Sequence, residues 1–323
     1  SINDISAMVS TNHVFRLRLD DESVIIAKFS FFGTYEDFLE DHSLINALAN
    51  NLPAPYDQLL SRSLLKKNQL FTYHHQTALL DAWVVFYNPI GVDRMLPKKI
   101  DERQIEILGG ELAHFHKTCS RLLNILPDWS KTLKGDMLRL LWFLDTEEGQ
   151  FQHRGTMGEI RRQVDIFDAN MNELDAYALE AVPVFVDWNI GNFSVTKGGK
   201  FYSRWDYDWF RMSSLVLDFY FFSRVCSTAG DKTVFSYLID TVMEDRFMIF
   251  LKAYHAVYPL SRQEVLFIKE AYRFFILNYV IKYGHYFFHD IYASRLQREA
   301  FEIYFPRLEK DFKPDKILQA LDL

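Results

Sequence analysis

The sequence predicts an α+β protein with two lobes, a small antiparallel β-rich lobe followed by a large helical lobe. Alternating and β-branched runs are concentrated in the first ninety residues, and helical spacing dominates from residue 101 onward. A chain of 323 residues is also about twice the length of a typical domain. We place the boundary at residue 90 and expect a β-rich lobe over 1–90 and a helical lobe over 91–323.

The elements of the first lobe follow from local patterns. A hairpin is indicated by two apolar runs that flank an acidic turn, and a helix by apolar residues at helical spacing that end before Pro53. A break at 88–91 predicts a hinge between the lobes. The expected elements are hairpin strands over 13–19 and 23–29, a helix over 35–49, and strands over 69–73 and 82–87.

Amphipathic helices are predicted through most of the second lobe. One region differs, because the β-favouring runs 182–195 and 199–205 are joined through Lys197-Gly198-Gly199 and read as a hairpin. The expected helices cover 101–124, 135–149, 155–180, 213–229 and nearly all of 233–312.

Composition excludes several classes of protein. Apolar residues make up 49% and charged residues 24%, which is ordinary globular usage. The net charge of −7 disfavours a broad nucleic-acid surface. No apolar run approaches 18 residues, and the first residues lack the basic start and apolar centre of a signal peptide. We therefore expect a cytoplasmic protein without nucleic-acid or membrane partners, and the sequence leaves its oligomeric state open.

Three oxygen-bearing side chains in the embedded hairpin suggest phosphoryl transfer. Asp187 is followed after five residues by Asn192, and after a further fourteen by Asp206. Mg²⁺ takes oxygen ligands and shares them with substrate phosphates, and Asn192 and Asp206 could supply two of these. Asp187 would then be free to orient an acceptor hydroxyl and to take its proton.

At these residues the chain resembles the aminoglycoside phosphotransferase and choline kinase group, small-molecule kinases with a protein-kinase-like fold. The resemblance covers roughly residues 10–225 and follows the family's order of elements. The matching segments are Asn12-His13-Val14-Phe15, Ile25-Ile26-Ala27-Lys28, Leu52-Pro53-Ala54-Pro55, the stretch from Leu108 to His116, and Asp187, Gly191, Asn192, Asp206, Tyr207, Asp208 and Asp218-Phe219.

The resemblance implies a role for each matched residue. Lys28 would contact the phosphates of ATP, Asn192 and Asp206 would bind Mg²⁺, and Asp187 would be the catalytic residue. An acid on the helix over 35–49 is expected to pair with Lys28; Asp41 is preferred, and Glu40 and Glu36 stay open.

Two further matched positions leave questions. Asp218 either accepts hydrogen bonds from the catalytic loop or caps a helix. The family's loop histidine and the glycine after it are Phe185 and Val186 here, and this puts the loop geometry in question.

The function expected is ATP- and Mg²⁺-dependent transfer of the γ-phosphate to a hydroxyl of a small molecule. The alternative is a pseudokinase or nucleotide-binding regulator without transferase activity, which Phe185 favours. A cationic acceptor, such as an amino sugar, an amino alcohol or a homoserine-like compound, would suit the excess of acids over 143–190, although these acids also fit a solvated helix face. Trp188, Trp205 and Trp209 either surround such a cation or pack in the core.

Overall fold

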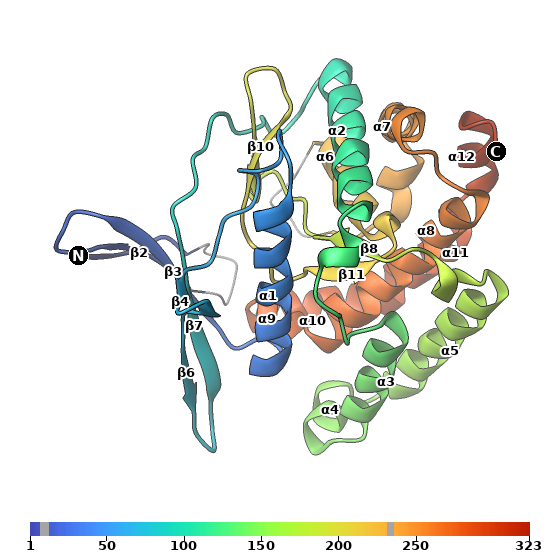
Figure 1. Ribbon diagram of the computed structural model, residues 1–323. Helices are drawn as coiled ribbons and strands as arrows, with labels where there is room; N and C mark the ends of the chain where they lie inside the picture. Colours follow the sequence, from blue (N-terminus) through green and yellow to red (C-terminus); the bar gives the residue numbers. More distant parts are fainter. Residues whose placement is uncertain (7–12, 231–235) are drawn as a thin grey trace.

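The computed structural model describes residues 1–6, 13–230 and 236–323. An antiparallel sheet lies at one side of the molecule, α1 (Tyr35–Asn51) lies beside it, and the remaining helices form the larger part (Figure 1). This arrangement confirms the predicted α+β architecture with a small β-rich and a large helical part. The lobe boundary at residue 90 stays a prediction, although β7 ends at Tyr87 and the next helix begins at Glu102.

The five-stranded sheet places Lys28 on its central strand. The strand order is β1-β2-β3-β7-β6, with all neighbours antiparallel. Lys28 on β3 lies opposite Val14 on β2 and Val85 on β7. The strands are β1 (Ile2–Asp4), β2 (His13–Arg18), β3 (Val24–Ser30), β6 (Thr72–Gln76) and β7 (Asp81–Tyr87), and β4 (Leu65–Lys66) pairs with β5 (Gln69–Leu70) beside them.

Helix α1 covers the sheet with an apolar face. Thr34 caps the helix by accepting a hydrogen bond from the amide of Asp37. Leu44, Ile45 and Leu48 are fully buried at the spacing of one helix face, and they belong to the same core as Val85 of the sheet. This packing fixes which side chains of α1 face Lys28.

The second part of the chain is mainly helical. Its longest helix, α2, packs along α7, and Gly109 lets the two approach closely because a Cβ there would collide with the carbonyl oxygen of Phe250. The helices are α2 (Glu102–Ser120), α3 (Leu133–Leu144), α4 (Glu147–Gln152), α5 (Met157–Glu173), α6 (Phe219–Cys226), α7 (Asp245–Val257), α8 (Arg262–Phe275), α9 (Gly284–Phe287), α10 (Asp290–Glu299), α11 (Phe305–Asp311) and α12 (Pro314–Ala320).

The predicted hairpin over 182–205 is partly wrong. Strands β9 (Phe193–Val195) and β10 (Phe201–Arg204) do form an antiparallel hairpin. However, β8 (Val182–Val184) pairs with β11 (Arg211–Ser213) and not with β9. The catalytic-loop candidates after β8 are therefore enclosed between two small sheets, and both of their ends are fixed.

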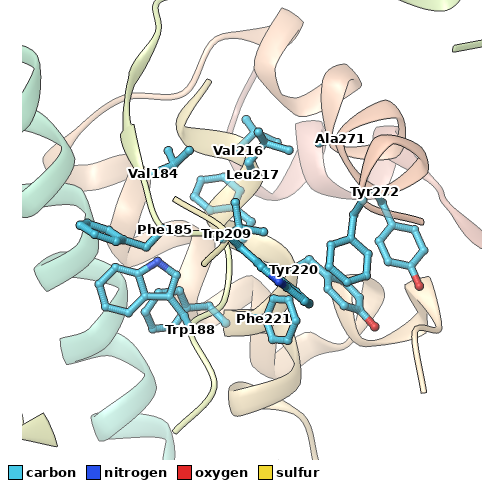
Figure 2. Close-up of a cluster of buried hydrophobic side chains, with 14 of the residues drawn as sticks. Val184, Phe185, Trp188, Trp209, Val216, Leu217, Tyr220, Phe221, Ala271 and Tyr272 are labelled. Carbon is cyan, nitrogen blue, oxygen red and sulfur yellow. The ribbon is translucent and has the colours of Figure 1, made fainter. Parts of the chain in front are cut away.

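Aromatic side chains build the core beneath this region. Phe185 and Trp188 contact each other edge to face at 5.9 Å, and Trp209 packs on Phe221 at 5.5 Å (Figure 2). Trp188 is fully buried and Trp209 is 6% exposed, so both tryptophans are core residues. The many aromatic residues of the sequence therefore form the core on which the candidate site lies.

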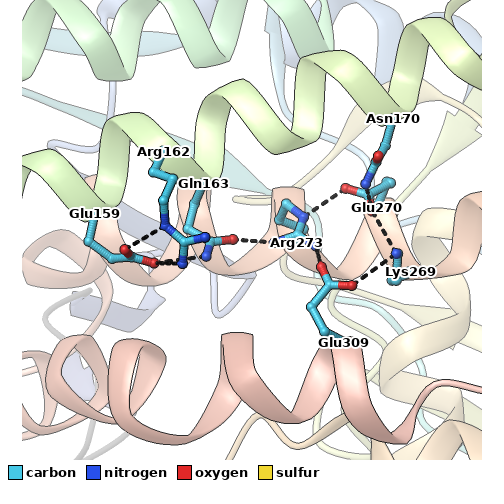
Figure 3. Close-up of polar contacts among 8 residues, drawn as sticks. All are labelled: Glu159, Arg162, Gln163, Asn170, Lys269, Glu270, Arg273 and Glu309. Atoms are coloured by element: carbon cyan, nitrogen blue, oxygen red, sulfur yellow. Dashed lines mark hydrogen bonds and ion pairs between the residues drawn. The ribbon is translucent and has the colours of Figure 1, made fainter.

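A buried charged network joins α5, α8 and α11. The Arg273 guanidinium is fully buried, donates to Glu270 at 2.8 Å, and also bonds to Gln163 and Glu309 (Figure 3). Asn170 on α5 donates to the same Glu270 at 2.7 Å. Because each buried charge has an opposite partner, the network ties the three helices together.

Candidate active site

An open cleft of about 630 Å³ lies between the sheet and the segments that follow β8 and β10. Apolar side chains of β2, β3 and the segment after β7 line one part of it, including Val14, Ile26 and Ile90. Lys28, Asn192 and Asp206 line the polar part. The structure thus brings together three of the predicted site residues from widely separated positions in the sequence.

Lys28 is held by two carboxylates. Its Nζ lies 2.9 Å from Oδ1 of Asp206 and 2.6 Å from Oδ1 of Asp208, and its side chain is only 9% exposed. Burial alone would lower the pKa of Lys28, but the two carboxylates outweigh it and raise that pKa above its ordinary value. The same ion pair lowers the pKa of Asp206, although burial would raise it. Lys28 and Asp206 are therefore charged in the protein at neutral pH.

The expected pairing of Lys28 with Asp41 is wrong in this structure. The Asp41 carboxylate instead bonds to the Lys131 ammonium, and Glu40 accepts hydrogen bonds from the amide and hydroxyl of Ser130. The reason is the rotation of α1, which turns these side chains toward the segment before α3. Glu36 is exposed and does not replace them.

His42 faces the sheet where the acid was expected. Its Nε2 accepts a hydrogen bond from the Tyr87 hydroxyl at 2.6 Å, and its Nδ1 donates to the carbonyl of Phe38. Burial, with a smaller effect from the positive charge of Lys28, lowers the pKa of His42 to about 3. A neutral histidine therefore stands on the helix beside Lys28, and the acids that balance the lysine come from the loop after β10.

Asp187 begins a compact loop. Its Oδ1 accepts hydrogen bonds from the amide of Asn189 at 3.2 Å and from that residue's side chain, while its carbonyl accepts from Asn192 at 3.3 Å. Burial, followed by the negative charge of Asp206, raises the pKa of Asp187 to about 7. A carboxyl group of this kind can exchange a proton near neutral pH.

Asp218 fixes the start of this loop. Its Oδ1 accepts from the amides of Phe185 at 2.9 Å and Val186 at 2.6 Å, and its Oδ2 lies 2.9 Å from Nε2 of His116. Asp218 and His116 are fully buried. Of the two roles left open for Asp218, the structure therefore has the first, that of acceptor for the catalytic loop.

Two departures from the family's loop pattern have a structural counterpart. Val186 has a φ of +61°, a left-handed conformation that is strained for a β-branched residue and natural for the family's glycine. Phe185 is fully buried, and the Arg204 guanidinium lies over its ring, 4.5 Å from the centroid. An apolar ring thus packs where a hydrogen-bonding histidine is usual.

The residues at the cleft fit a magnesium ion bound together with nucleotide phosphates. Asn192 and Asp206, whose side chains bear hard oxygen atoms, line the same cleft, and the Asp206 side chain is 38% exposed. Among the described residues no group of three or more His, Cys, Asp or Glu forms a closed metal site. Two protein oxygens with the remaining positions left to water and phosphate are what Mg²⁺ commonly takes.

The features that suggested a cationic acceptor lie elsewhere. Trp205 is the one tryptophan of the three that lines the cleft, because Trp188 and Trp209 are buried in the core. Most acids over 143–186 are exposed on α4, α5 and nearby turns, and none lines the cleft. The acids over 143–186 thus form a solvated surface.

Arg204 and Asp208 are site residues whose roles the sequence did not reveal. Asp208 stood in the matched motif, and its distance of two residues from Asp206 was the available signal. The sequence signal for Arg204 was weaker: it is a charged residue within an otherwise β-favouring run. The predicted nucleotide-covering turn at 10–12 lies outside the described residues, and β2 begins directly after it at His13.

Comparison with known structures finds the same fold in several small-molecule kinases. A solved amicoumacin kinase, in complex with AMP-PNP, Ca²⁺ and the ligand Ami, matches with a TM-score of 0.66 and 14% identity over 98% of this chain and 91% of its own. A microcompartment-associated aminopropanol kinase matches with a TM-score of 0.60 and 14% identity, covering 93% of this chain and 90% of its own. The ethanolamine kinase of Plasmodium vivax matches with a TM-score of 0.55 and 11% identity, over 95% and 84% of the two chains.

These likenesses confirm that the fold is the one suggested by the resemblance to the aminoglycoside phosphotransferase and choline kinase group. No protein-family profile and no curated protein sequence matches the chain. In the part of the chain that the structure describes, no helix is long and apolar enough to cross a membrane.

Proposed function

We propose that the protein is an ATP- and Mg²⁺-dependent phosphotransferase that moves the γ-phosphate to a hydroxyl group of a small molecule. One observation carries the proposal. The Lys28 ammonium and the Asp206 carboxylate, 178 positions apart, meet at 2.9 Å in a cleft that Asn192 also lines, on the fold of solved small-molecule kinases.

Each residue has a distinct role in the proposed reaction. Lys28 binds nucleotide phosphate oxygens, while Asn192 and Asp206 hold the magnesium ion, which neutralises charge on the phosphates when it is bound. Asp187 orients the acceptor hydroxyl and takes its proton as the oxygen bonds to the γ-phosphorus. The bond from that phosphorus to the bridging oxygen breaks, and ADP leaves with the electron pair. Placement of the groups supplies most of the catalysis.

Amino alcohols are the first acceptors to test. Two of the three similar structures carry names of kinases for such compounds, aminopropanol and ethanolamine. Among the described residues that line the cleft, Asp206 is the one acid available to an ammonium group. Uncharged alcohols and amino sugars therefore belong in the same panel, as does homoserine.

The rival function is nucleotide binding without transfer. Phe185 and the left-handed Val186 favour it, since both occupy loop positions where the family has histidine and glycine. Under this alternative the protein binds Mg-ATP but produces no ADP with any acceptor.

The deciding experiment combines thermal melting with a transfer assay. Mg-ATP at 100 times its Kd should stabilise the fold by about 2.7 kcal/mol, which raises Tm by several degrees. Asp206→Asn should lose the magnesium-dependent part of that rise and all turnover. Asp20→Asn, in an exposed turn remote from the cleft, is the matched control. Full activity of Asp206→Asn would refute the metal assignment, and a shift without turnover would favour the rival function.

A further inference from the structure

Arg204 ends β10 as one of the most deeply buried charges of the described chain. Its exposed fraction is 0%, which is unusual for an arginine. The guanidinium finds its partners among backbone carbonyls. Nη1 donates to the carbonyls of Trp205 at 2.6 Å and Asp206 at 2.9 Å, and Nη2 donates to the carbonyl of Asp187 at 3.0 Å.

These contacts join the two segments that bear the proposed catalytic and metal-binding carboxylates. Asp187 follows β8 and Asp206 follows β10, two strands of different small sheets, and the hydrogen bonds of Arg204 connect the main chains of these residues through one planar group. Hydrogen bonds from a charged donor are stronger than neutral ones, and a rigid fork adds geometric precision. The guanidinium thus sets the spacing between the two backbones.

Aromatic rings hold the guanidinium in place. Its central carbon lies 4.5 Å from the centroid of the Phe185 ring, 4.7 Å from that of Trp188 and 5.9 Å from that of Tyr207. Arginine stacks favourably on such ring faces, and the attraction grows when water is excluded. A phenylalanine at position 185 is therefore complementary to an arginine at position 204.

The backbone of Arg204 is anchored to the segment that follows α1. Its amide donates to the carbonyl of Leu59 at 2.6 Å, and its carbonyl accepts from the amide of Ser61 at 3.0 Å. The Tyr207 hydroxyl donates to the same carbonyl of Arg204. The guanidinium consequently has a fixed base from which to hold the loops.

We propose that Arg204 is a positioning residue that fixes Asp187 relative to Asp206, and that it does so together with the Phe185 ring in place of a loop histidine. The inference rests on the proposed function of this site. On this inference, Phe185 and Arg204 together hold the loop that the family's histidine holds. The presence of Phe185 is then no longer an argument for an inactive kinase.

The first test compares Arg204→Lys with the wild-type protein. Lysine keeps the positive charge but lacks the planar fork, so it cannot reach all three carbonyls in the same geometry. Turnover is measured as hydrolysis of Mg-ATP with water as acceptor, and ethanolamine is then added. The rate is divided by the number of nucleotide-binding sites from calorimetry, so that unfolded protein does not count.

We expect turnover per binding site to fall at least tenfold in Arg204→Lys, and on the order of 10²-fold in Arg204→Met, because a displacement of about 1 Å at a catalytic group can cost that much. The Kd of ATP without magnesium should stay within twofold of wild type, since the apolar part of the cleft is untouched. Turnover per site within twofold of wild type in Arg204→Lys would overturn the proposal.

Arg273→Lys is the matched control. Arg273 is also fully buried and paired, but it lies in the network of α5, α8 and α11 (Figure 3). It should lower Tm without changing turnover per binding site. An equal loss of turnover in this control would mean that any buried arginine has the effect, and would overturn a specific role for Arg204.

Phe185→Leu covers the case in which the Arg204 variants do not fold. It removes the ring face but leaves the three hydrogen bonds and a buried apolar side chain. Turnover per site should drop several-fold with nucleotide affinity unchanged, and an unchanged turnover would count against the pairing.

Failure of the proposed function can be told apart from failure of this inference. If the wild-type protein turns over no ATP with water or ethanolamine, the ratio of the ATP Kd values without and with magnesium replaces turnover. A smaller ratio in Arg204→Lys than in wild type would support the inference that Arg204 positions Asp206, even without turnover. An equal ratio would overturn that inference.

Discussion

Replacement of Asp218 by alanine should unfasten the loop that carries Asp187. The Asp218 carboxylate is fully buried and accepts hydrogen bonds from two backbone amides, those of Phe185 and Val186, as well as contacting His116. Each buried amide left without a partner costs about 1–3 kcal/mol. Val186 also loses a bond that holds its left-handed conformation. Asp218→Ala should therefore lower the free energy of unfolding by about 2–6 kcal/mol.

Urea unfolding followed by tryptophan fluorescence measures this loss, because Trp188 lies in the affected loop. Asp218→Asn is the matched variant, since its amide oxygen can still accept from both backbone amides, and its loss should be less than half as large. A loss below about 1 kcal/mol in Asp218→Ala would show that the loop does not depend on these bonds, and the reasoning about loop geometry would fail.

Two further predictions concern charge. The pKa of Asp187 is raised to about 7 in the folded protein, against 3.8 in an unfolded chain. The free energy of unfolding therefore falls as the pH rises from about 3.8 to about 7. Asp187→Asn should thus be more stable than wild type at pH 8, by on the order of 4 kcal/mol, and nearly equal to it at pH 4 in urea titrations; equal stability at pH 8 would contradict the raised pKa. Because Lys28 pairs with Asp208 and not with Asp41, Asp208→Asn should raise the Kd of Mg-ATP about tenfold, whereas Asp41→Asn should leave it within twofold. Calorimetry measures both Kd values. A larger effect of Asp41→Asn than of Asp208→Asn would indicate that Asp41 is the partner of Lys28.

Sequence reasoning reached the fold and the cleft because both depend on local patterns and on a shared order of elements. Lys28 lies within β3, Asn192 directly precedes β9, and Asp206 closely follows β10; the structure brings the three residues together as expected. The sequence could not predict the partner of Lys28, and the reason is geometric. Asp41 and His42 are neighbours about 100° apart on a helix, so a small rotation of α1 decides which of them faces the lysine.

Two other features depended on contacts between distant segments. The pairing of β8 with β11 involves three-residue strands separated by an intervening hairpin, and such short strands carry little signal of their partner. The role of Arg204 was hidden because its acceptors are backbone carbonyls, which every residue possesses. Only the folded arrangement shows which carbonyls it reaches.

The double ion pair of Lys28 has a consequence for the thermodynamics of ligand binding. An ammonium group loses its water when it is buried, and in this protein that dehydration is already complete before any nucleotide arrives. Under the proposed function, a phosphate that reaches Lys28 would exchange places with a carboxylate, and the lysine would change partner with little further loss of hydration. The energetic cost of dehydrating this charge therefore belongs to folding, and the proposed affinity for nucleotide would depend on how readily Asp206 releases Lys28.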